Sequence, residues 1–134
     1  MRRKPSIAIA AGGSLYLALI SVSYLSSQSP DTDGIYQDGL IESVASLLAW
    51  FLPALVAGSI TRAKPIILGS ILGLLMVTFD FGVTAIAFGW EWAVALLGVF
   101  PASQMFLVIS AMAFAYAGWK IRALNARASS RNVA

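Results

Sequence analysis

The sequence predicts an all-α integral membrane protein, an antiparallel four-helix bundle with both termini on the cytoplasmic side. Three observations lead to this prediction. Of the 134 residues, 59% are hydrophobic and only 11% are charged, whereas roughly a quarter of the residues in a soluble domain are charged. The apolar residues form four stretches that are each long enough to cross a bilayer. All the basic residues fall on one side of the layout that these stretches define.

Each predicted span meets the length requirement of the bilayer. A hydrocarbon core of about 30 Å needs about 20 apolar residues, because each helical residue advances the chain by about 1.5 Å. The first three stretches are 7–25, 40–60 and 66–88. The fourth, 93–119, is longer than the bilayer needs, and Pro101 lies within it, so we expect this helix to tilt or to kink. Short connections make the last three spans antiparallel neighbours.

The charges give the chain an orientation. Cytoplasmic segments of membrane proteins are enriched in Lys and Arg, so both termini are predicted to be cytoplasmic, in a bacterial inner membrane. Interfacial tryptophans agree, with Trp90 and Trp92 at the outer boundary and Trp119 at the inner one. The nine basic residues are Arg2, Arg3, Lys4, Arg62, Lys64, Lys120, Arg122, Arg127 and Arg131, and the acidic residues of the opposite side are Asp31, Asp33, Asp38 and Glu91.

The N-terminal stretch also allows a second interpretation. A basic start followed by an apolar run and small residues has the layout of a secretory signal peptide that is cut after Ser23. The apolar run is longer than the usual signal core of about 7–15 residues, and Tyr24 and Leu25 continue it. We therefore expect an uncleaved first span. Cleavage would leave three spans, with the N-terminus outside.

Asp80 is an acidic residue inside the third span, about 12 Å from the outer end of that helix. Placing an aspartate at the centre of a membrane helix costs about 2.5–3.5 kcal/mol, which the apolar residues of the span offset. On one face of the helix, Asp80 aligns with Gly69 and Gly73, a pair of small residues that lets another helix approach closely. Asp80 is therefore expected on the packed face of the span, away from lipid.

Several polar residues of the other spans are expected at a similar depth. They are Ser103 and Gln104 on the fourth span, Ser46 on the second, and Tyr16 and Ser21 on the first. No Lys or Arg lies at this depth, so we expect Asp80 to be protonated and to donate a hydrogen bond, for example to Gln104. Two interpretations of this buried polar layer remain open: it fixes the register of the helices, or it forms a proton or cation site.

The sequence offers little for catalysis or metal binding. It contains no Cys and no His, which removes thiolate chemistry and the commonest transition-metal ligand. The segment 29–40 has part of the acidic spacing of a calcium loop, but Leu40 would occupy the position where an EF-hand needs a bidentate Glu. We therefore expect no metal site, no cofactor and no enzymatic activity.

Three functions are compatible with these features. The first, which we favour, is a non-enzymatic membrane protein that acts by helix association, as an accessory subunit of another membrane protein or as a homo-oligomer. The second is a small proton- or cation-coupled transporter or channel that uses Asp80. The third is a holin-like pore former with a basic tail. The expected partners are the lipid bilayer and membrane helices, and not nucleic acid, although the net charge is +3.

Overall fold

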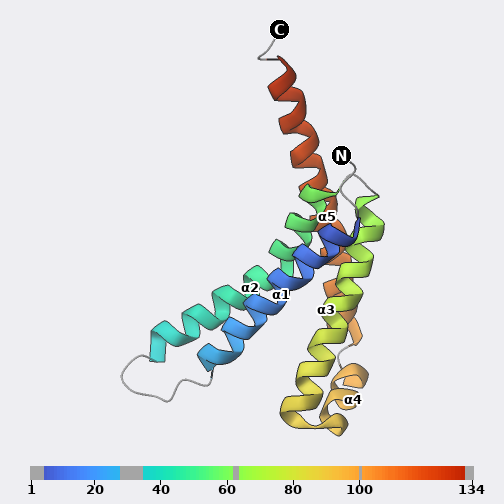
Figure 1. Ribbon diagram of the computed structural model, residues 1–134. Coiled ribbons are helices and arrows are strands. Elements are labelled where there is room, and N and C mark those ends of the chain that lie inside the picture. Colours follow the sequence, from blue (N-terminus) through green and yellow to red (C-terminus); the bar gives the residue numbers. More distant parts are fainter. Residues whose placement is uncertain (1–4, 28–34, 62–63, 100, 132–134) are drawn as a thin grey trace.

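The computed structural model describes residues 5–27, 35–61, 64–99 and 101–131. Four of the helices in these ranges are long and apolar enough to cross a membrane, and the helix Trp90–Val99 is not one of them. The prediction of an all-α chain with four helices of membrane-spanning length is therefore confirmed. The helices are α1 (Pro5–Ser27), α2 (Ile35–Ile60), α3 (Pro65–Phe88), α4 (Trp90–Val99) and α5 (Pro101–Arg131), as Figure 1 shows.

The fourth predicted stretch, 93–119, differs from the structure. It is divided between two helices, because α4 ends at Val99 and α5 begins at Pro101. Proline is well tolerated at the start of a helix, where its missing N–H needs no acceptor, and it disfavours helical conformation at the residue before it. Pro101 is accordingly the first residue of α5, and residue 100 lies outside the described part. By contrast, α2 continues through Pro53.

The packing is organised around α5, which lies against α2 and against α3. α1 packs along α2, and α4 packs mainly on α3, while α1 and α3 touch each other much less. In Figure 1, the α1–α2 pair diverges from α3 and α4 toward the end of the molecule that is farthest from the chain termini. Both chain termini lie at the end where α2 is followed by α3, and α5 projects beyond the other helices there.

Small residues let α5 approach α2 very closely. A Cβ atom built at Gly58 would collide with the backbone of Ala115, and one built at Gly118 would collide with the backbone carbonyl of Leu55. Close contacts of this kind between backbones are the usual mode of helix packing in membranes, where dispersion contacts take the place of hydrophobic burial. The core that results contains many alanines and few large side chains, namely Tyr16, Leu68, Leu72, Met76 and Leu107.

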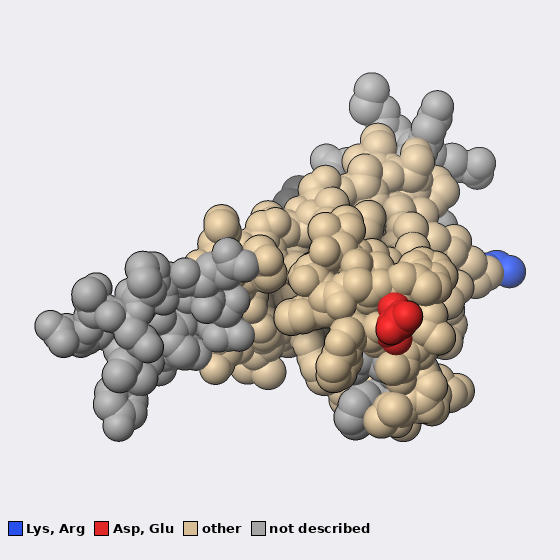
Figure 2. Space-filling model, turned by 90° about the horizontal axis from the view of Figure 1, so that it is seen from below, with Lys and Arg blue, Asp and Glu red and all other residues tan. Residues whose placement is uncertain are grey.

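The outward faces of the described helices are apolar. Figure 2, which views the molecule from the end where α3 meets α4, shows uncharged atoms over most of the described surface. Large side chains are strongly exposed, and Ile86 reaches 89%. Soluble monomers rarely expose contiguous apolar patches of more than a few hundred Å². The surface is therefore suited to hydrocarbon, in keeping with the apolar composition of the helices.

Candidate functional site

A hydrogen bond joins α1 to α3 through the acidic residue of the third predicted span. The hydroxyl of Tyr16 donates to Oδ1 of Asp80, with 2.6 Å between the two oxygens. Tyr16 is 2% exposed, and its ring stacks on that of Phe79, with 6.5 Å between the ring centroids. Because α1 and α3 share few other contacts, the pair is a principal link between these helices.

The partner of Asp80 differs from the one proposed as an example from the sequence. Asp80 accepts a hydrogen bond from Tyr16, whereas we expected it to donate, for example to Gln104. A carboxyl oxygen accepts a phenol hydrogen in both the ionised and the protonated form of the acid, so the bond holds in either state. Gln104 lies instead beside Leu74 and Val77 of α3, in a groove that Asp80 does not line.

The serines expected at the depth of Asp80 lie elsewhere in the packing. Ser46 on α2 pairs with Ser23 on α1, with 2.8 Å between their hydroxyl oxygens. This second polar contact ties α1 to α2 in the same way that Tyr16 ties α1 to α3. Ser103, near the start of α5, is exposed. The predicted polar residues therefore do not form one layer with Asp80: Ser46 bonds to α1, and Ser103 is exposed.

Gln104 lies in a groove of about 280 Å³ between α3 and α5. Its Oε1 atom is buried and accepts no hydrogen bond from the described residues. A buried polar atom without a partner costs about 1–3 kcal/mol of stability. A hydrogen-bond donor from another molecule that reached this oxygen would remove that cost. The groove is otherwise apolar, and its remaining lining residues are Leu74, Val77, Met105, Val108 and Ile109.

Gly69 and Gly73 lie against α5. A Cβ atom at Gly69 would lie 2.6 Å from Cα of Met112, and one at Gly73 would lie 2.8 Å from Cα of Val108. The face of α3 that packs on α5 at these glycines meets α1 at Asp80. The neighbour of α3 thus changes along the helix, from α5 at the two glycines to α1 at Asp80.

Arg122 has a role that the sequence did not indicate. Its Nη1 atom donates to the backbone carbonyls of Ser59, Ile60 and Thr61 at 3.3, 3.0 and 3.2 Å, respectively. The last four carbonyls of a helix lack donors within the helix, and a cation is favoured at that negative end of the helix dipole. Arg122 therefore caps α2 from α5. Its separation of about 60 residues from α2 explains why no local pattern revealed the cap.

The described side chains offer hydrogen bonding but no recognisable catalytic group. Among them, no group of three or more Asp, Glu, His or Cys residues could hold a metal ion, and the side chains of 29–40 lie outside the described part. Neither the Tyr16–Asp80 pair nor Gln104 forms a nucleophile activated by a base. No protein-family model, curated protein or solved structure matches the chain. A functional proposal therefore has to come from the contacts described above.

Proposed function

We propose that the chain is an integral protein of the bacterial inner membrane, with four antiparallel spans and both termini in the cytoplasm. The length and apolar composition of α1, α2, α3 and α5 support this placement. Lys64 at the start of α3 and the basic end of α5 share the end of the molecule where the chain termini lie (Figure 1). Basic residues of this kind mark the cytoplasmic side.

We further propose that the chain acts by helix association and forms a homo-oligomer, without enzymatic chemistry. The groove around Gln104 is the observation that carries this proposal, because it combines apolar walls with a buried amide oxygen that lacks a partner among the described residues. Amide side chains hydrogen-bond across membrane helices. An amide holds both a donor and an acceptor, so the Gln104 side chains of two copies related by a two-fold axis hydrogen-bond to each other when each rotates from its groove toward the other copy.

Replacing Gln104 with leucine is expected to weaken self-association about three- to thirtyfold, the effect of a membrane hydrogen bond of about 0.6–2 kcal/mol. The association constant is obtained from energy transfer between donor- and acceptor-labelled copies in liposomes, measured as the protein is diluted with lipid. Thr78→Val is the matched control, because the Thr78 hydroxyl bonds to the carbonyl of Leu74 in its own helix. This variant should associate like the wild type.

Two results would contradict the homo-oligomer. The first is a wild-type protein that is monomeric at every dilution, and the second is a Gln104→Leu protein that associates normally. A monomer that co-purifies with another membrane protein in fixed proportion would instead support the role of accessory subunit.

Proton or cation transport is the second candidate, and the hydrogen bond between the Tyr16 phenol and the Asp80 carboxyl favours it. Titratable groups inside membrane spans commonly mark ion or proton pathways, where they face a water-filled cavity. Among the described residues, Asp80 does not line the Gln104 groove, the pocket beside Arg122, or the pocket between α1 and α3 near Pro5. Association is therefore the better-supported proposal.

A further inference from the structure

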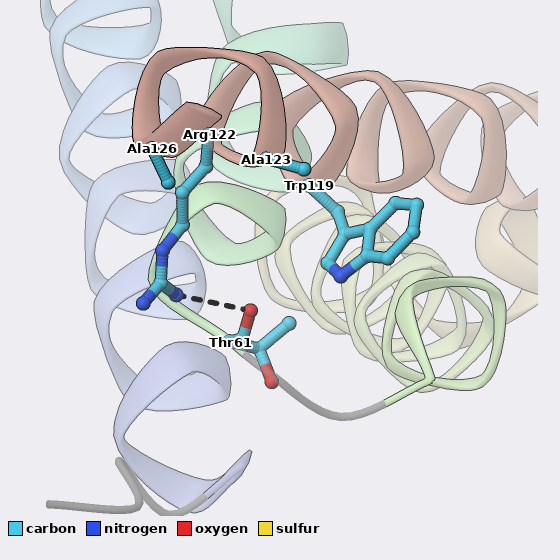
Figure 3. Close-up of a pocket in the computed structure, with 5 residues that line it drawn as sticks. All are labelled: Thr61, Trp119, Arg122, Ala123 and Ala126. Carbon is cyan, nitrogen blue, oxygen red and sulfur yellow. Dashed lines mark hydrogen bonds between the residues drawn. The ribbon is translucent and has the colours of Figure 1, made fainter. Parts of the chain in front are cut away.

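A small pocket lies beside Arg122, at the end of the molecule where α1 begins and α2 ends (Figure 1). It has a volume of about 240 Å³ and is lined by Thr61, Trp119, Arg122, Ala123 and Ala126. Four of these residues belong to successive turns of α5, and Thr61 directly follows α2. Figure 3 shows the Arg122 and Trp119 side chains extending from α5 with Thr61 between them. The alanines leave room that larger side chains would fill.

The Arg122 guanidinium is fixed in place but only partly used. Its hydrogen bonds to described residues all come from Nη1, which donates to the last two carbonyls of α2 and to the carbonyl of Thr61. A guanidinium carries five N–H groups in a rigid fork, and no described residue accepts a hydrogen bond from those on Nη2 and Nε, so we assign them to the ligand. Because the carbonyls already hold the side chain, binding loses little further side-chain freedom.

The chemistry of the pocket fits the phosphate of a lipid. Guanidinium pairs with phosphate through two parallel hydrogen bonds and is the preferred group for this task. Trp119 offers an apolar ring with one N–H, the combination that is favoured where hydrocarbon meets headgroups. The apolar wall formed by Ala123, Ala126 and the indole suits glycerol and the first acyl carbons, whereas a hydrated free ion gains nothing from it.

We infer that this pocket binds one anionic phospholipid, with the Arg122 guanidinium on the phosphate and the Trp119 ring along the glycerol end of the acyl chains. The inference rests on the membrane placement proposed above. It assigns to Arg122 a double task, since the same side chain caps α2 and holds a lipid of the leaflet on that side. The Trp119 ring also contacts the ring of Tyr116, with 5.8 Å between ring centroids. This contact restricts the orientation of the indole.

Native mass spectrometry of the full chain in detergent, titrated with phosphatidylglycerol, tests the inference. The wild type is expected to retain one lipid per chain, and Arg122→Gln to bind it at least about tenfold more weakly, as for loss of a charged hydrogen bond. Ala123→Leu fills the pocket without changing the charge and should show the same loss. Lys120→Gln is the charge-matched control, because Lys120 is exposed and does not line the pocket, and it should bind like the wild type.

A thermal melt accompanies each variant, and Ala123→Leu decides the outcome if Arg122→Gln fails to fold. Normal binding by Ala123→Leu, an equal loss in Lys120→Gln, or equal retention of phosphatidylcholine would overturn the inference. Inorganic phosphate is expected not to displace the lipid, and displacement would assign the pocket to free phosphate instead. A lipid that stays bound in a protein whose C-terminus proves to be external would leave the pocket standing and overturn only the proposed orientation.

Discussion

Replacing Gly118 with alanine is expected to lower the free energy of unfolding by about 1–3 kcal/mol, the cost of overpacking a close-packed interior. The added methyl group would collide with the carbonyl oxygen of Leu55 on α2. A backbone atom cannot rotate away as a side chain does, so the two helices have to separate. Gly58→Ala should have a similar effect, because its methyl group would meet the backbone of Ala115. Thermal melts in detergent give the comparison.

Gly82→Ala is the matched control for this prediction. A Cβ atom at Gly82 meets no other atom within 4 Å, and alanine is the better helix former by about 1 kcal/mol. The control should therefore melt at the wild-type temperature or above it. If Gly118→Ala has the same melting temperature as the control, α2 and α5 are not packed backbone to backbone.

Replacing Asp80 with leucine is expected to cost about 1–3 kcal/mol, because the buried Tyr16 hydroxyl then lacks an acceptor. Tyr16→Phe should also destabilise, since it leaves the Asp80 carboxyl without its donor. Asp80→Asn should be nearly harmless, because an amide oxygen accepts the same hydrogen bond. The double variant Tyr16→Phe/Asp80→Leu should lose less than the sum of the two single losses, since neither polar group is then stranded. Strictly additive losses would show that the two residues do not pair.

The same variants separate a structural role of Asp80 from transport. Proton and sodium flux is measured in liposomes for the wild type and for Asp80→Asn, with the melts as evidence of folding. We expect no flux that depends on Asp80. A wild-type flux that disappears in a stably folded Asp80→Asn protein would favour the transporter, because only a titratable or anionic group can do that work.

The four long helices could be predicted because each apolar run is long enough to cross a bilayer and is bounded at its ends by polar or charged residues. The division at Pro101 could not, because a proline inside an apolar run is compatible with a kink and also with a new helix.

The candidate site was only partly predictable for a similar reason. Asp80 was evident as a charge in an apolar stretch, but the depth of the other polar residues left several partners for it. The choice of Tyr16 depends on which face of α1 meets α3. The contacts of Gly58 and Gly118 join parts of the chain that are far apart in sequence. A usable signal was present in α5, where Ala111 and Ala115 have the spacing of small residues that pack against another helix.

Four membrane spans with both ends in the cytoplasm are the central claim, and a topology reporter tests it most directly. A reporter that is active only in the cytoplasm is fused after Ala134, inserted near Ala63, or inserted at Asp33, in otherwise identical chains. Activity is expected at the first two positions, which the positive-inside rule places in the cytoplasm, and none is expected at Asp33. Activity at Asp33 would contradict the four-span arrangement.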